Sequence, residues 1–199
     1  IDFEKAINLA HDFNIKLVVD AAAGIGSSIN GLAIGKMEMD SAIMSFNGNK
    51  NITSGGGGVV LTNKIEIASK ASHLSKTGKV GTNYDHDCIA FNYRMTNIQA
   101  AVGCAQLEQL NKIVLRKKEI DQYYRDNIKF DQVNFFPRIP DRESSGWLSG
   151  ILVNSEDIKP IISLLKSYNV ESKFFWKPIN LQKPYLNNLK STLEFSEKL

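Results

Sequence analysis

The chain contains little that would cross-link it, anchor it in a membrane or attract nucleic acid. Only two of its 199 residues are cysteines, Cys88 and Cys104, and their spacing matches neither a disulfide framework nor a paired-cysteine zinc site. No apolar run reaches the roughly eighteen residues of a transmembrane helix. Lys and Arg are not clustered with aromatic residues, and the net charge is only +3. We therefore expect no membrane or nucleic-acid partner, and the cytoplasm is the expected compartment.

A metal site is not expected either. His86, Asp87 and Cys88 offer three types of ligand in a row. Side chains of adjacent residues in an extended segment point in opposite directions, however, so these three are not expected to close around one ion. What is present is an ordinary globular balance, with 43% hydrophobic and 23% charged residues, which suits a chain with a sizeable core.

Lys50 is the residue on which the functional interpretation depends. It lies between an apolar, strand-like run that reaches Ser45 and four consecutive glycines at residues 55–58. Upstream, residues 15–19 predict a buried strand that places Asp20 at its carboxyl end, where a run of small residues follows. An aspartate, a serine and a lysine in this order match the requirements of a pyridoxal phosphate site.

The chemistry of pyridoxal phosphate explains why these residue types belong together. The cofactor is an electron sink when its pyridine nitrogen is protonated, and a carboxylate such as Asp20 favours that form. A lysine amine such as Lys50 holds the cofactor as an imine, and the hydroxyl of Ser45 can donate to the phosphate. Taken singly, each feature has an ordinary alternative: a surface lysine, a helix N-cap at Asp20, or a flexible glycine turn or hairpin.

Two segments resemble a known family. Residues 45–58 (SFNGNKNITSGGGG) are similar to the lysine segment of the DegT/DnrJ/EryC1/StrS sugar aminotransferases, and residues 91–101 (FNYRMTNIQAA) are similar to their "NYR…QAA" signature. The glycine run most resembles the branch that aminates keto-sugars for perosamine-type and legionaminic-type glycans. The resemblance implies a pyridoxal phosphate-dependent transferase of fold type I, like aspartate aminotransferase. Its α/β fold would have a three-layer α/β/α large domain and a smaller α+β C-terminal domain.

Carried over residue by residue, the resemblance assigns roles to the candidate residues. Lys50 would be catalytic, binding the cofactor and then moving a proton between the substrate carbon and the cofactor carbon. Asp20 would face the pyridine nitrogen, and Ser45 would touch the phosphate. Asn92 would reach the phosphate of the cofactor in a partner subunit, which implies a homodimer with a shared active site. Asn47 is a further candidate for contact with the substrate.

The implied reaction transfers an amino group from L-glutamate to the keto carbon of a nucleotide-linked deoxysugar, in the biosynthesis of a surface polysaccharide or glycan. Two positions depart from the family pattern. Ala23 stands at a cofactor-binding position that usually carries Gln, His or Glu, and Asn180 stands at a sugar-binding position that often carries His. These departures leave open a non-catalytic relative that binds cofactor or sugar nucleotide as a sensor or scaffold. A dehydratase of the same fold is a third alternative. Lys50 argues against both, because the dehydratase branch is expected to carry histidine there and a non-catalytic relative is expected to lose the lysine.

The resemblance also implies that the chain is a piece of a longer protein, because family members are about twice this length and the first residue is Ile1. We expect residues 1–95 to be the C-terminal part of the large cofactor-binding domain. Residues 96–128 are expected to form a long interdomain helix, and residues 129–199 to form part of the small domain.

Hydrophobic periodicity and turn residues predict the individual elements. A first helix is expected to begin after Asp2 as its N-cap. A long helix over residues 97–127 is expected to begin with a Thr96/Gln99 capping box and to bury an apolar stripe that includes Ile98 and Val102. The other expectations are strands at 16–19, 42–46, 58–61, 150–153 and 170–173, a helix at 65–74, a polar loop at 75–87, an N-cap at Ser155, and aromatic residues 174–176 packed between the domains.

Overall fold

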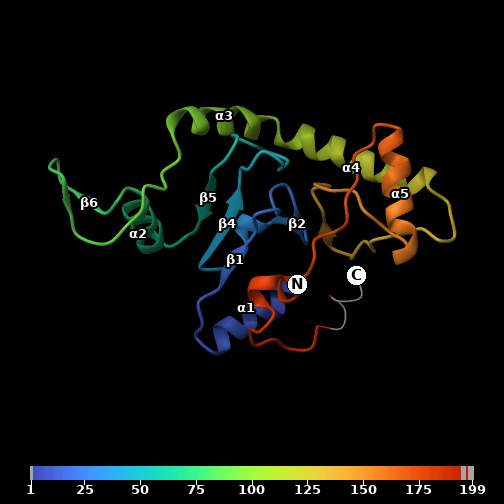
Figure 1. Ribbon diagram of the computed structural model, residues 1–199. Helices are drawn as coiled ribbons and strands as arrows, with labels where there is room; N and C mark the ends of the chain where they lie inside the picture. Colours follow the sequence, from blue (N-terminus) through green and yellow to red (C-terminus); the bar gives the residue numbers. More distant parts are fainter. Residues whose placement is uncertain (1, 194–195, 197–199) are drawn as a thin grey trace. The chain divides into compact units, whose positions relative to one another are not determined.

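Three strands form the main sheet, in the order β1-β4-β5 (Figure 1). The computed structural model describes residues 2–193 and 196. β1 and β4 are parallel, with Asp20 opposite Ile43, whereas β4 and β5 are antiparallel. The predicted strand at 58–61 is confirmed, and the strands predicted at 16–19 and 42–46 are displaced by one or two residues. The bounds are β1 Val18–Asp20, β4 Ser41–Ser45 and β5 Gly58–Leu61.

The two faces of this sheet differ in burial. Alternate residues of a strand point to opposite faces, and Val19, Ala42 and Met44 are buried together in the core of this unit. α1 (Phe3–Asp12) and α4 (Leu110–Asn127) add partly buried side chains to the same core. On the other face, Ile43 and Val60 lie opposite each other and are 43% and 47% exposed. The apolar core of this unit therefore lies on one side of the sheet.

Asp40 joins the beginnings of two strands and the end of the third. Its buried carboxylate accepts a hydrogen bond from the backbone N–H of Leu17 (2.7 Å) and another from the amine of Lys64, and the Lys16 amine lies 3.6 Å away. Its backbone oxygen accepts from the hydroxyl of Thr62 (2.6 Å). The hydrogen bond from Lys64, followed by the one from Leu17, lowers the pKa of Asp40.

We expect Asp40→Asn to destabilise the protein at neutral pH and to make little difference in strong acid. Because the folded-state pKa of Asp40 is lowered, its contribution to stability is present above the ordinary carboxyl pKa of about 4 and is lost as the pH falls through the lowered value. Urea unfolding of both proteins across pH 2–7 measures this. Asp12→Asn is the matched control, since the Asp12 carboxylate is exposed. Equal unfolding midpoints for parent and Asp40→Asn at pH 7 would contradict the prediction.

A helix and a hairpin follow the sheet. α2 (Ile65–Ser75) confirms the predicted helix at 65–74, and the predicted polar loop at 75–87 contains the paired strands β6 (Lys79–Val80) and β7 (Asp85–His86). The predicted loop therefore contains a short antiparallel hairpin that was not expected. Two-residue strands leave almost no alternating pattern, and backbone pairing over a short turn is enough to form them.

The predicted long helix is interrupted. It consists of α3 (Asn97–Glu108) and α4, with Gln109 between them, where φ is −97° and ψ is 1°. The capping box at Thr96 and Gln99 is confirmed. The expectation that the apolar stripe is core is wrong for α3, because Ile98 is 79% exposed and Gly103 is the buried residue. Gly103 lies beside the glycine-rich loop, where a Cβ on it would be 3.9 Å from the Cβ of Ser54, an ordinary van der Waals distance.

The chain divides into two compact units, and residues 138–149 return to the first. There β9 (Arg142–Glu143) pairs with β2 (Ser28–Ile29), and β2 also pairs with β3 (Leu32–Ala33). The short helix η1 (Ile34–Lys36) follows β3 in the chain. The first unit comprises Ile1–Tyr124 and Arg138–Ser149, and the second comprises Arg125–Pro137 and Gly150–Leu199.

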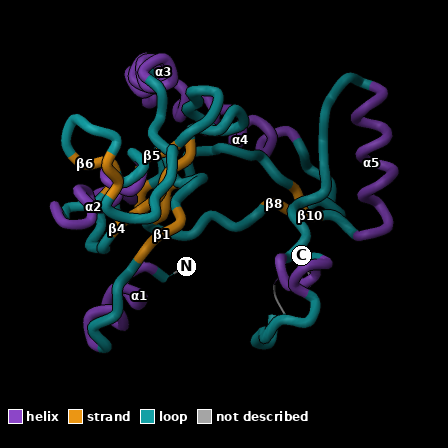
Figure 2. Tube along the Cα trace, turned by 60° about the vertical axis from the view of Figure 1, so that its left-hand side comes forward, coloured by secondary structure: helices purple, strands orange, loops and turns teal. Residues whose placement is uncertain are grey.

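The second unit is a small α+β arrangement. β8 (Asn134–Phe135) and β10 (Ile151–Leu152) lie side by side as an antiparallel pair (Figure 2). They are followed by α5 (Ser155–Ser167) and the short helices η2 (Ile179–Leu181) and η3 (Lys183–Tyr185). β10 confirms the strand predicted at 150–153 with narrower bounds.

Three expectations for the second unit are wrong. Residues 170–173 form no strand. The N-cap position of α5 is Asn154, which has extended backbone angles, so Ser155 is already helical. Residues 174–176 are each more than half exposed, although Phe175 contacts the rings of Phe136 and Trp176. Across the described part of the chain, no helix is both long enough and apolar enough to cross a membrane.

Candidate active site

Two parallel strands bring Asp20 and Ser45 to one edge of the sheet. β1 ends at Asp20 and β4 ends at Ser45. Asp20 pairs with Ile43, so Ser45 lies two residues further along the neighbouring strand. Ligands of open α/β sheets bind beyond the carboxyl ends of parallel strands. The edge that carries Asp20 and Ser45 is therefore the expected location of a ligand-binding site.

A local turn holds the carboxylate of Asp20. One of its oxygens accepts a hydrogen bond from the backbone N–H of Ala22 (3.0 Å), while the residue stays exposed. The chain then continues as a turn and not as a helix, so Asp20 is not an N-cap. Ala23 lies exposed in the same turn, where its methyl group offers no polar contact.

A tight turn connects Ser45 to Lys50. The hydroxyl oxygen of Ser45 accepts from the backbone N–H of Asn47 (3.2 Å), and the backbone N–H of Lys50 donates to the carbonyl of Asn47 (3.0 Å). The side-chain amide of Asn47 donates to the Asn49 side chain (3.3 Å). Asn47 is exposed and Ser45 half-buried. This turn keeps Lys50 close in the chain to the sheet edge that carries Ser45.

The glycine-rich run after Lys50 is a shaped loop. The Ser54 hydroxyl donates to the carbonyl of Gly56 (2.6 Å), and the Ser54 N–H donates to the carbonyl of Phe46 (3.0 Å). Where β5 begins, a Cβ on Gly58 would lie 2.5 Å from the carbonyl oxygen of Met44. Glycine is therefore required for the close approach of β5 to β4, and the rest of the run lies in the connection between these two antiparallel strands, as the hairpin alternative expected.

Sequence reasoning missed Trp147, the aromatic residue beside the lysine. The half-buried Lys50 places its amine 3.8 Å from the centroid of the Trp147 ring. The indole N–H of Trp147 donates to the backbone oxygen of Asn49 (2.6 Å). Among the described residues, no carboxylate forms an ion pair with Lys50. Residues 50 and 147 lie too far apart in the sequence for any local pattern to relate them.

Two further predicted site residues belong to other elements of the chain. Asn92 is exposed, and its backbone forms a bridge with Lys76, just after α2. Asn180 is buried within η2 of the second unit. Their assignments to a partner's cofactor and to the sugar remain predictions.

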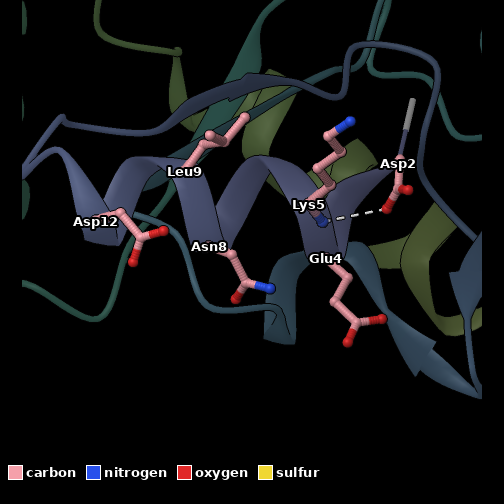
Figure 3. Close-up of a pocket in the computed structure, with 6 residues that line it drawn as sticks. All are labelled: Asp2, Glu4, Lys5, Asn8, Leu9 and Asp12. Atoms are coloured by element: carbon pink, nitrogen blue, oxygen red, sulfur yellow. Dashed lines mark hydrogen bonds between the residues drawn. The ribbon is translucent and has the colours of Figure 1, made fainter.

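The hollow in Figure 3 lies elsewhere. It runs along α1 and is lined by that helix and its cap, where the carboxylate of Asp2 accepts from the N–H of Lys5 (3.1 Å). This contact confirms Asp2 as the N-cap. The hollow contains none of the predicted site residues, and a groove formed by one helix offers a ligand no converging groups.

A second group of titratable residues joins α2 to the hairpin. Nε2 of His73 lies 2.7 Å from a carboxylate oxygen of Asp87, and with Cys88 the three candidate ligand atoms lie within 4.8 Å of one another. The hydrogen bond with His73 lowers the pKa of Asp87, and the one with Asp87 raises the pKa of Cys88. His86 instead contacts the carbonyl of Thr77 (2.8 Å). The grouping differs from the consecutive trio considered in the sequence, and the absence of a metal remains a prediction.

Comparison with known proteins identifies what this arrangement resembles. The profile of the DegT/DnrJ/EryC1/StrS aminotransferase family matches residues 1–199. GDP-perosamine synthase of Vibrio cholerae is 36% identical over 186 residues, covering 89% of this chain and 49% of that protein. UDP-4-amino-4,6-dideoxy-N-acetyl-beta-L-altrosamine transaminase of Campylobacter jejuni is 29% identical, covering 98% of this chain and 50% of that protein. The chain thus spans about half the length of the curated relatives it matches.

Solved structures show the same fold. PseC of Helicobacter pylori, an aminotransferase involved in the biosynthesis of pseudoaminic acid, matches with a TM-score of 0.88 and 22% identity, covering 100% of this chain and 55% of that one. TlmJ of Streptoalloteichus hindustanus matches with a TM-score of 0.87 and 22% identity, covering 96% of this chain and 52% of that one. The predicted α/β fold of type I is confirmed by these likenesses. With its whole length matched by the family profile, the chain belongs to the DegT/DnrJ/EryC1/StrS aminotransferase family.

Proposed function

We propose that this chain is the part of a pyridoxal phosphate-dependent sugar aminotransferase that contains the cofactor-binding lysine, Lys50. The observation that carries the proposal is the position of Asp20 and Ser45 at the ends of two adjacent parallel strands, with Lys50 at the end of the turn that follows. Lys50 would bind the cofactor covalently, Asp20 would face its pyridine nitrogen, and Ser45 would contact its phosphate.

The residues present fit this cofactor. An exposed carboxylate follows β1, and an amine follows β4 on a short turn. The Ser45 hydroxyl accepts from Asn47, which leaves its own hydrogen to donate to a phosphate. When bound, pyridoxal phosphate supplies an electron sink. Lys50 would hold and move the proton at the reacting carbon, and the charge of Asp20 would keep the pyridine nitrogen protonated.

The substrate proposed for the whole protein is a nucleotide-linked keto-deoxysugar. Relatives that match 89% and 98% of the chain are named for GDP-linked and UDP-linked amino sugars, which supports this class without choosing the nucleotide. We propose L-glutamate as the amino donor, a glycan or polysaccharide pathway, and a cytoplasmic homodimer in which Asn92 reaches the partner's cofactor. Ala23 would add only a methyl contact to the cofactor, and Asn47 and Asn180 would contact the sugar.

The domain roles are part of the same proposal. Residues 1–95 would belong to the large cofactor-binding domain, 96–128 to the interdomain helix and 129–199 to the small domain.

A likeness of fold to Spr1654 of Streptococcus pneumoniae, which was solved in a PLP form, supports the cofactor assignment. The two chains are 26% identical with a TM-score of 0.81, and the match covers 92% of this chain and 52% of that one.

Borohydride labelling tests the assignment directly. Sodium borohydride fixes pyridoxal phosphate to any lysine with which its aldehyde has condensed, and peptide mass mapping then locates the label. In the complete protein that contains this chain, we expect the label on the peptide with Lys50. Label confined to other lysines, or none on a folded protein with cofactor in excess, would overturn the proposal and favour a sensor or scaffold.

A further inference from the structure

One distant segment contacts the residues on both sides of Lys50. The side-chain amide of the buried Asn51 donates to the carbonyl of Ser145 (3.3 Å), and the indole of Trp147 donates to the carbonyl of Asn49 (2.6 Å). The ring of Trp147 also lies over the Lys50 amine, 3.8 Å from its centroid. The segment Ser145–Trp147, about a hundred residues downstream, therefore contacts Lys50 and both of its chain neighbours.

The segment is itself held in place. Ser145 is 1% exposed, and its N–H donates to the hydroxyl of Ser27 (3.1 Å), in the stretch between β1 and β2. Gly146 has a positive φ of 67°, and a Cβ there would lie 3.0 Å from the backbone of Lys117 in α4. Only glycine fits this turn without strain. The turn presents Ser145 to Asn51 and Trp147 to Lys50.

Two ion pairs connect residues 138–143, which precede this segment, to α4. Arg138 contacts Asp121 (3.1 Å), and Glu143 contacts Lys118 (2.8 Å), so the strand that leads to Ser145 is attached to α4. β9 pairs with β2 at the same point. Because Ser145, Gly146 and the segment 138–143 that leads to them are held in place, the Trp147 ring has a defined position over the Lys50 amine.

We propose that Trp147 is a positioning residue for Lys50, and that its ring face is the resting place of the charged amine when that amine is neither bonded to the cofactor nor moving a proton. The face of an indole ring attracts an ammonium group, so the amine stays beside its turn and does not extend into solvent. This deepens the proposed function and rests on it, because a resting place matters only for a lysine that is repeatedly released and used again.

The cation–π contact has a measurable signature that packing alone does not have. The ring face attracts and covers the ammonium group of Lys50, so its removal exposes the amine to an acylating reagent. Competitive acetylation of the cofactor-free protein at a fixed pH, read by peptide mass spectrometry, gives the reactivity of Lys50 relative to the other lysines without any need for activity. Trp147→Leu retains an apolar side chain but has no aromatic face, and we expect it to raise the acetylation rate of Lys50 about two- to fivefold.

Matched variants separate the two contacts. Trp147→Phe retains the aromatic face and loses the hydrogen bond to Asn49, and we expect it to leave the acetylation rate of Lys50 near the parent value. Lys79 lies over the ring of Tyr84 (4.3 Å) outside the site, so Tyr84→Leu should raise the acetylation rate of Lys79 and leave that of Lys50 unchanged. Trp147→Met, which fills space flexibly, replaces Trp147→Leu if the latter does not fold.

The outcome is separable from that of the proposed function. A folded Trp147→Leu or Trp147→Met protein with an unchanged acetylation rate at Lys50 would overturn the resting-place inference, even if borohydride labels Lys50. Absence of the borohydride label from the parent, with faster acetylation of Lys50 in these variants, would overturn the aminotransferase proposal and leave the Trp147 contact standing as a structural one.

Discussion

Replacing Lys50 with alanine is expected to lower the rate of amino transfer by two to four orders of magnitude, the usual contribution of a positioned proton-transfer group. The variant also loses the only amine that the turn after β4 presents at the sheet edge. Single-turnover conversion of the bound cofactor by L-glutamate, followed by absorbance in the complete protein, measures the effect without knowledge of the sugar. Lys16→Ala is a suitable control, because the Lys16 side chain is 74% exposed and lies at the opposite end of β1.

Lys50→Arg separates the charge of the lysine from its role as a base. Arginine retains a cation that can lie over the Trp147 ring, but its guanidinium does not lose a proton at ordinary pH. We therefore expect Lys50→Arg to fold normally and to be as inactive as Lys50→Ala. An arginine or alanine variant with a rate within tenfold of the parent would remove Lys50 from the catalytic role.

Asp20→Asn is expected to have the second largest effect, a loss of roughly 10- to 100-fold in the same reaction together with weaker cofactor binding. Asparagine retains a side-chain oxygen to accept from the Ala22 N–H, so the turn after β1 is preserved. What it loses is the negative charge, and hydrogen bonds that involve a charged group are worth about 1.5–3 kcal/mol. A tenfold change corresponds to about 1.4 kcal/mol.

The comparison with Asp20→Ala shows whether charge or turn geometry matters. Alanine removes both the charge and the hydrogen bond to Ala22, so it should be at least as damaging as asparagine and should also lower the unfolding midpoint. If Asp20→Asn reacts with glutamate as fast as the parent, Asp20 does not face the pyridine nitrogen.

Local signals predicted the elements whose limits depend on neighbouring residues. The capping box of Thr96 and Gln99 sets the start of α3, and Asp2 caps α1, because a cap needs only residues a few positions away. Asp20 and Ser45 were found for a similar reason, since each ends a short apolar strand. Their proximity also follows from the sequence once the two strands are taken as parallel neighbours.

Other features depended on contacts that no local pattern carries. The interruption at Gln109 lies inside a segment of good helix formers, and the hairpin of β6 and β7 is only two residues wide on each side. The stripe on α3 had a correct helical period, but periodicity identifies an apolar face without identifying what covers it. In the described chain that face is open at Ile98.

The sequence by itself determined the family, the fold class and the order in which a carboxylate, a hydroxyl and an amine follow two strands. These properties depend on residue type and short spacing, which are visible along the chain. Only the tertiary structure decided that Trp147 covers Lys50 and that His73, not His86, meets Asp87. Each of those contacts joins residues that packing and backbone pairing bring together. The free energy that favours such a contact comes from interactions throughout the fold, so the identities of the two residues alone do not predict it.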